Sequence, residues 1–203
     1  DSGSLRHRYG GVRDMLLGLS FVRCDGQIAK AGGRVVKNVA GYDLMKLFIG
    51  SYGTLGILTE ATFRAYPVQE AAGTVVLTGD GEAIASTTKT LLASALTPTA
   101  VDVLSTQLVT QLGLGQGLGL MVRFQSIAQS VKEQSSRLLE VGQKLGLQGN
   151  LYTDTDSEAL ASLRASEANL WQSLPEKIWT TPHQPAITCK IGVLPSSAVT
   201  TLT

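Results

Sequence analysis

The chain has 203 residues, of which 43% are hydrophobic and 16% are charged, and its formal net charge at pH 7 is +1. This apolar content is enough for one or two modest cores, and the small charge gives no electrostatic case for binding nucleic acid or an acidic membrane. No apolar run approaches the roughly 20 residues that a transmembrane helix needs.

Cysteine and histidine are too sparse to form a metal-binding motif. Cys24 and Cys189 lie too far apart in sequence for a zinc or iron–sulfur pattern, and His7 and His183 form no recognisable pair. We therefore expect no metal site. We expect both cysteines to be reduced and packed, which fits a cytoplasmic protein.

The first sixty-odd residues predict a small sheet with a glycine-rich turn. A polar, turn-rich start precedes a hairpin, in which strands 17–24 and 27–30 flank Asp25-Gly26. A basic loop from Arg34 to Ala40 then leads to a short helix, capped by Asp43 and ended by Gly50, with Leu44, Leu47 and Phe48 as its apolar face. Glycines at 50, 53 and 56 precede an alternating strand that begins at Ile57 and ends before Pro67.

This glycine turn matches neither common phosphate-binding motif. A P-loop requires Gly-Lys-Ser/Thr after its glycines, and that triplet is missing. A dinucleotide fingerprint runs from strand to glycines to helix, whereas here the glycines follow a helix and precede a strand. Glycines so spaced permit a close backbone approach, either to a bound group or to another strand.

The rest of the chain predicts a ferredoxin-like antiparallel sheet. Residues 68–73 look like a linker, and Asp80 caps a helix that extends to about Ala95. Ser126 and Gln129 form a capping box for a helix ended by Gly146, and Thr155 with Glu158 forms a second one for a helix carrying Leu160 to Leu174. The expected strands are 74–78, 100–104, 118–124, 150–153 and 187–193. The order β-α-β-β-α-β is typical of ferredoxin-like folds.

Two blocks resemble a known flavoprotein superfamily: SGSLRHRYGGVRDMLLGLSFVRCDG and GGRVVKNVAGYDLMKLFIGSYGTLGILTEATFRAYP. They look like the second half of the FAD-binding domain of vanillyl-alcohol-oxidase-type (PCMH-type) flavoproteins, and are most similar to FAD-binding subunits of glycolate oxidase. D-Lactate dehydrogenases and alkylglycerone-phosphate synthase are also similar. The resemblance implies an α+β protein, with the C-terminal part of the FAD-binding domain at 1–67 and a cap or substrate domain at 68–203. It also implies a fragment that lacks the N-terminal phosphate-loop subdomain.

The resemblance implies cofactor contacts in three places. Ser2 and Gly3 would lie against the diphosphate side of FAD, and Gly10 would shape the same wall. Asn38, with Lys37, would face the cofactor cleft. The turn and the strand after it would follow the flavin through Gly53, Thr54, Gly56 and Ile57. Relatives usually carry glutamate where this chain has Tyr52, so we expect the tyrosine to hold the loop through its hydroxyl or by packing.

The resemblance also implies a function: an FAD-dependent subunit that oxidises a small 2-hydroxy acid, glycolate or D-lactate, by hydride transfer to flavin. Its partners would be other subunits of an electron-transfer complex, including an iron–sulfur subunit, and it would be cytoplasmic or membrane-associated through them. No residue presents itself as the catalytic base. Arg123 and Lys190 lie on expected strands and could bind a substrate carboxylate. Two alternatives remain: a non-catalytic ligand- or partner-binding module, and a sibling D-2-hydroxy acid dehydrogenase.

Overall fold

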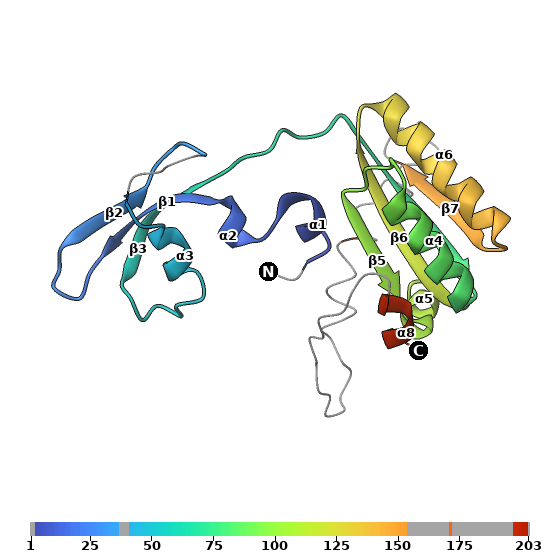
Figure 1. Cartoon of the computed structure of the whole chain (residues 1–203), viewed down its shortest axis with the longest axis horizontal. Helices are drawn as coiled ribbons and strands as arrows, with labels where there is room; N and C mark the ends of the chain where they lie inside the picture. Colours follow the sequence, from blue (N-terminus) through green and yellow to red (C-terminus); the bar gives the residue numbers. More distant parts are fainter. Residues whose placement is uncertain (1–2, 37–40, 154–170, 172–196, 203) are drawn as a thin grey trace. The chain divides into compact units, whose positions relative to one another are not determined.

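The computed structural model describes residues 3–36, 41–153, 171 and 197–202. It divides the chain into two compact units, Asp1–Val68 and Gln69–Thr203 (Figure 1). The division lies one residue from the boundary expected at 67/68. Both units mix helices with antiparallel sheets, so the predicted α+β class is confirmed.

Unit 1 is a three-stranded antiparallel sheet with short helices. Strand β1 (Leu16–Val22) lies between β2 (Ile28–Gly32) and β3 (Ile57–Phe63). The helices are α1 (Arg6–Tyr9), α2 (Val12–Met15) and α3 (Leu44–Phe48). The predicted hairpin is confirmed, since Gly26 has φ of 79° and its amide donates to the Arg23 carbonyl at 3.0 Å.

The core of unit 1 is small. Leu19, Phe21 and Met45 are its buried apolar side chains, and the Phe48 ring lies 4.3 Å from the Phe21 ring. The expected face of α3 was wrong at one position, because Leu47 is 59% exposed while Met45 is buried. In a helix of five residues, positions three apart share a face, so Met45 and Phe48 meet the sheet together.

Unit 2 has the ferredoxin-like topology that the sequence predicts. Its strands are β4 (Ala71–Gly79), β5 (Ala100–Leu104), β6 (Leu118–Ser126) and β7 (Gln148–Thr153), in the order β5-β6-β4-β7 with every neighbour antiparallel. Helices α4 (Gly81–Ala93) and α6 (Ala128–Lys144) connect β4 to β5 and β6 to β7. Two short helices, α5 (Thr106–Gln111) and α8 (Ala198–Leu202), were not expected.

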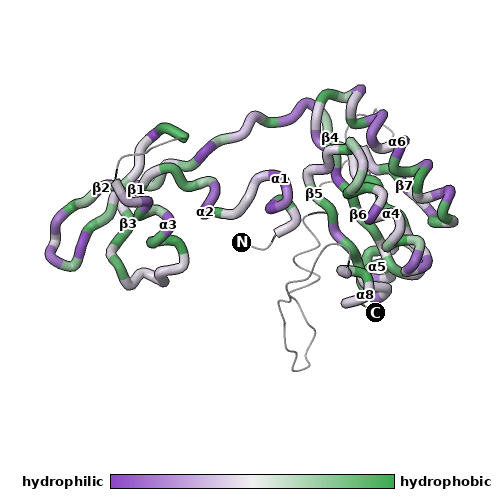
Figure 2. The backbone as a smooth tube through the Cα atoms, in the orientation of Figure 1, coloured by the Kyte–Doolittle hydropathy of each residue, from purple (hydrophilic) through white to green (hydrophobic). Residues whose placement is uncertain are grey.

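The strands of unit 2 bury side chains on both faces of the sheet. Val75 and Leu77 pack with Ile84 and Leu91 of α4 on one face, whereas Val76 packs with the α5 side on the other. Figure 1 shows α4 and α6 beside each other over the first face, and Figure 2 shows β6 as largely hydrophobic along its length. Continuous burial explains why β4 and β6 read as apolar runs rather than strict alternations.

The start of α4 agrees with the cap predicted from the sequence, whereas the start of α6 does not. The Asp80 carboxylate accepts from the amides of Glu82 at 2.9 Å and Ala83 at 3.3 Å, so the predicted cap is confirmed. The capping box at Ser126 was wrong, because Ser126 pairs with Ala71 in the sheet and α6 starts after Ile127. That same pairing begins β4 at Ala71, so the expected linker is shorter than residues 68–73.

Two expected elements lie mostly outside the described residues. These are the helix with its capping box at Thr155 and Glu158, of which only Trp171 is described, and the strand at 187–193.

Two neighbouring leucines of α4 provide a test of the packing. Leu91 is 2% exposed and packs in the core, whereas Leu92 is 44% exposed. We expect Leu91→Ala to lower the free energy of unfolding of unit 2 by about 2–5 kcal/mol, through lost burial and a residual cavity. Leu92→Ala should change it by less than about 0.5 kcal/mol. Urea unfolding followed by circular dichroism measures both, and equal losses would contradict the packing.

Candidate functional site

The glycine turn between α3 and β3 has a positive φ angle at four of its residues. The φ angles are 83° at Gly50, 53° at Tyr52 and 77° at Gly53, and Gly56 is at 155°. The amide and the hydroxyl of Thr54 both donate to the Ser51 carbonyl, at 3.0 and 2.7 Å. These bonds close the turn on itself, and they occupy the Thr54 hydroxyl proton.

The two glycines at 53 and 56 differ in the space around them. A Cβ at Gly56 would stand 2.6 Å from the Val22 carbonyl oxygen, so glycine is needed there for the chain to approach the end of β1 this closely. A Cβ at Gly53 would meet no atom within 4 Å. Within the part of the chain that the structure describes, no acceptor meets the backbone amides of Gly53 and Leu55. Gly53 thus lies in open space, and the amides of Gly53 and Leu55 are donors that no described acceptor uses.

Tyr52 does not have the role expected from the sequence. Its side chain is 97% exposed, and no hydrogen bond or ring contact connects it to another described residue. It neither holds the loop through its hydroxyl nor packs against it. Among the described residues, it is also the one non-glycine with a positive φ.

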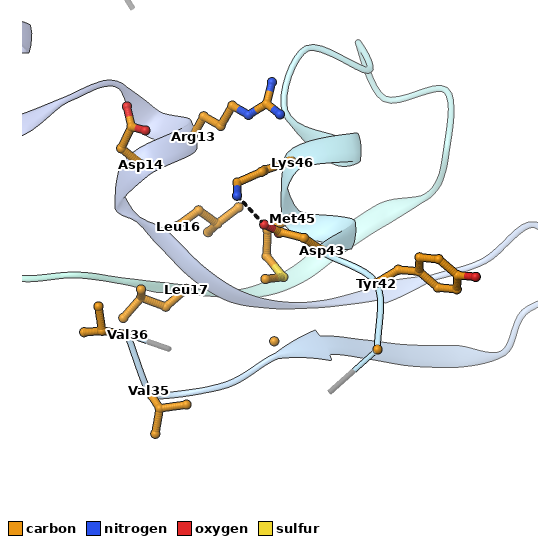
Figure 3. Close-up of a pocket in the computed structure, with 12 residues that line it drawn as sticks. Arg13, Asp14, Leu16, Leu17, Val35, Val36, Tyr42, Asp43, Met45 and Lys46 are labelled. Carbon is orange, nitrogen blue, oxygen red and sulfur yellow. Dashed lines mark ion pairs between the residues drawn. The ribbon is translucent and has the colours of Figure 1, made fainter. Parts of the chain in front are cut away.

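A pocket of about 270 Å³ lies beside α3 in unit 1 (Figure 3). We call it the α3 pocket. Its shape depends on Gly32 (φ of 71°), where a Cβ would collide with the Leu17 carbonyl and the Met45 side chain. The pocket is lined by Arg13, Asp14, Leu16, Leu17, Gly32, Val35, Val36, Gly41, Tyr42, Asp43, Met45 and Lys46.

The rim of the α3 pocket carries two acids and two bases. Lys46 Nζ lies 2.6 Å from Asp43 Oδ2, and this hydrogen bond, with the charges of Lys46 and Arg13, lowers the pKa of the Asp43 carboxyl. Asp14 Oδ2 accepts from the Gly11 amide at 2.8 Å. Arg13 has no ion-pair partner among the described residues. Figure 3 shows its side chain extending from α2 towards α3.

The residues expected to contact the cofactor fall into separate places. Gly3 lies in an exposed turn, and Gly10 ends α1 where a Cβ would be 2.7 Å from Asp14 Cβ. Gly53, Thr54 and Gly56 form the turn, and Ile57 opens β3 with 72% of its surface exposed. Ser2, Lys37 and Asn38 lie outside the described residues.

None of these expected residues that the structure describes lines the α3 pocket. Sequence reasoning missed the pocket because its walls come from α2, the start of β1, the loop after β2 and α3. The glycines that flank the 34–40 loop, at 33 and 41, were the available signal.

Unit 2 holds one of the two expected carboxylate-binding candidates. Arg123 lies on β6, with its Cζ 5.7 Å from the centre of the Trp171 ring. The Trp171 indole donates to the Thr74 hydroxyl at 2.9 Å, and Thr74 pairs with Arg123 across the sheet. This cluster joins β4 and β6 to Trp171, which lies 97 positions after Thr74. The second candidate, Lys190, lies outside the described residues.

A second cavity, of about 720 Å³, lies in unit 2 at the start of α4, with Val199 and Thr200 of α8 among its lining residues. The Asp80 carboxylate already accepts two amides of the helix start, so those donors are not available to an anion. Among the described residues, no group of His, Cys, Asp or Glu side chains could hold a metal ion.

Comparison with known proteins finds curated oxidases and dehydrogenases that are similar to part of this chain. No protein-family model matches the sequence. The chain is 41% identical over 106 residues to glycolate oxidase subunit GlcD of Bacillus subtilis, covering 51% of this chain and 23% of that protein. It is 46% identical over 69 residues to the mitochondrial D-lactate dehydrogenase [cytochrome] of Arabidopsis thaliana, covering 34% and 12%.

Comparison with solved structures supports the fold of the chain and nothing beyond it. Alkyldihydroxyacetonephosphate synthase superposes with a TM-score of 0.62 at 20% identity, over 86% of this chain and 35% of that one. The chain spans less than a quarter of the length of the two curated relatives named above. The resemblance noted from the sequence is confirmed.

The ion pair of α3 gives a pH-dependent test. Because the Asp43 pKa is lowered, the pair stabilises the folded form above the carboxyl's ordinary pKa and is lost as pH falls through the lowered value. We expect Lys46→Met to raise the Asp43 pKa towards its ordinary range, measured by carboxyl NMR titration. Lys89→Met, an exposed change on α4, is the control and should leave Asp43 unchanged. An unchanged Asp43 titration in Lys46→Met would contradict the assignment.

Proposed function

We propose that the chain is part of an FAD-dependent oxidoreductase acting on a small 2-hydroxy acid. The premise is its similarity to a glycolate oxidase subunit and a D-lactate dehydrogenase. The observation that carries the proposal within the structure is the glycine turn. It presents the unused amides of Gly53 and Leu55 beside open space. Glycolate is the first candidate substrate and D-lactate the second.

When bound, FAD would supply the redox chemistry by accepting a hydride from the α-carbon of the substrate. The chain's own contribution in unit 1 is to position the cofactor. The Gly53 and Leu55 amides would donate hydrogen bonds to the cofactor, and hydrogen bonds to a flavin tune its reduction potential. Thr54 offers its hydroxyl oxygen as an acceptor, because its proton is bonded to Ser51.

Unit 2 is the proposed cap or substrate domain. Arg123 is the proposed partner of a substrate carboxylate, since a guanidinium forms paired hydrogen bonds with a carboxylate. Stacking against Trp171 would restrict the guanidinium to one plane. Among the described residues, no side chain stands out as a general base.

The proposed partners follow from the relatives' names. Glycolate oxidase subunits are by name parts of a larger assembly, so we propose that other subunits, including an iron–sulfur subunit, receive the electrons. We propose a cytoplasmic location, or attachment to a membrane through those subunits. Within the described residues, none of the helices has both the length and the hydropathy to span a bilayer. A non-catalytic module and a sibling dehydrogenase for another 2-hydroxy acid remain alternatives, and no observation favours either.

Cofactor binding can be tested with two glycines of equal strain. Gly53 and Gly26 have φ of 77° and 79°, and a Cβ would meet nothing within 4 Å at either. Alanine at either position should cost about 1 kcal/mol of stability through left-handed backbone. We expect only Gly53→Ala to weaken FAD binding, by about fivefold or more, because only that Cβ stands beside the unused amides. FAD titration followed by flavin absorbance measures it, and equal affinities in the two variants would contradict the site.

The substrate class is tested by bleaching of bound flavin. We expect glycolate or D-lactate to bleach the visible absorption band of bound flavin under anaerobic conditions, because oxidised flavin is the species that absorbs there. Bleaching by 2-hydroxyglutarate alone would favour the sibling dehydrogenase. If flavin binds and none of these acids bleaches it, the non-catalytic module is the better description.

A further inference from the structure

We propose that Tyr52 is a cofactor-contacting residue whose ring packs against the flavin ring of FAD at the glycine turn. The inference rests on the proposed function, in which the amides of Gly53 and Leu55 hold the cofactor, and it adds a side chain to that contact. It also replaces the role that the sequence predicted for Tyr52, which was to hold the loop.

The backbone of Tyr52 is strained for a residue of its kind. Its φ angle is 53°, and it is the one non-glycine with a positive φ among the described residues. Left-handed backbone is unfavourable for a bulky side chain, and glycine or asparagine usually occupies it. The ring is 97% exposed, and within the described residues no hydrogen bond or ring contact compensates for the strain. A contact with a bound ligand would account for a tyrosine in this place.

The residues around Tyr52 suit a flat, uncharged ring system. Residues 47–59 include no charged side chain. Leu55, Ile57 and Leu58 follow Tyr52 closely in the chain, and all three are exposed. Exposed apolar and aromatic side chains gain by covering the face of an aromatic ligand. A phosphate group would meet no cation among these residues, so the flavin ring fits the turn better than the diphosphate of FAD does.

The turn offers two kinds of contact to one ring. Tyr52 directly precedes Gly53, and consecutive Cα atoms lie about 3.8 Å apart, so its side chain starts beside the unused amides. A flavin ring has a polar edge, which backbone amides can bind, and aromatic faces, which a tyrosine ring can cover. The two hydrogen bonds from Thr54 to the Ser51 carbonyl hold the turn in shape before a ligand arrives.

The first experiment measures FAD affinity in variants of the full chain. Asparagine tolerates left-handed backbone, so Tyr52→Asn removes the ring without adding strain. We expect this change to weaken FAD binding by about two- to tenfold, the range for a lost aromatic pair. Tyr52→Phe keeps the ring and should bind FAD within about twofold of the unchanged chain. Tyr42→Asn is the matched control, because Tyr42 is 91% exposed but lies before α3, outside the turn.

The second experiment measures the fluorescence of bound flavin. A phenol in contact with an excited flavin donates an electron to it and so quenches the emission, and the electron then returns. The phenyl ring of phenylalanine is too poor a donor to do this. We therefore expect the emission of bound flavin to rise in Tyr52→Phe while its affinity is kept, and to stay unchanged in Tyr42→Phe.

Thermal unfolding without cofactor separates ligand contact from a structural role. If Tyr52 served only the fold, its loss would lower the midpoint of unfolding. We expect Tyr52→Asn to keep or raise the midpoint, because asparagine relieves the left-handed strain and the described structure gives the ring no contact to lose. A lower midpoint in Tyr52→Asn would contradict the inference.

The outcomes separate this inference from the proposed function. If FAD binds and the Tyr52 variants match the unchanged chain in affinity and emission, the tyrosine inference fails while the flavin proposal stands. Weaker FAD binding with unchanged emission would put the ring against the adenine of FAD and would also overturn it. If the unchanged chain binds no FAD at millimolar concentration, both the inference and the flavin proposal fail for this chain.

Discussion

The close approach of Gly56 to the end of β1 is the constraint on which unit 1 depends. Gly56 passes so close to the Val22 carbonyl that any Cβ would collide with it, and the next residue, Ile57, pairs with Val22. This close approach therefore fixes where β3 begins and its register against β1. Because the chain turns back there, Gly53 is left in open space with unused amides nearby. One steric requirement thus produces both the third strand and the proposed flavin contact.

Unit 2 depends instead on the pairing of its two central strands. Nine residue pairs join β4 to β6, from Ala71–Ser126 to Gly79–Leu118, and both strands bury side chains on each face. Helices α4 and α6 cover one face, and the other face carries the α5 contacts together with Arg123, Thr74 and Trp171. A sheet covered by helices on one face leaves the second face available for a polar cluster, and this is where the proposed carboxylate partner lies.

Local signals in the sequence predict the structure where the interactions are local. Asp25-Gly26 makes the hairpin and Asp80 caps α4, because each acts on residues within a few positions. Ser126 fails as a cap because its backbone pairs with Ala71, a partner 55 positions away that local reasoning cannot see. The sequence did not predict the α3 pocket for the same reason. Arg13 and Lys46 come to line one pocket only after β1, β2 and the intervening loop have folded. The cofactor contacts inferred from resemblance stay predictions.

The small core of unit 1 connects its folding to its proposed ligand. Leu19, Phe21 and Met45 form its buried apolar cluster, whereas Ile28, Ile57 and Phe63 on its strands are more than half exposed. So little burial leaves a unit of this size near the margin of stability. A ligand that binds only the folded form stabilises it by mass action. Met45 both belongs to the core and lines the α3 pocket, so a ligand bound in that pocket would contact the core of unit 1 directly.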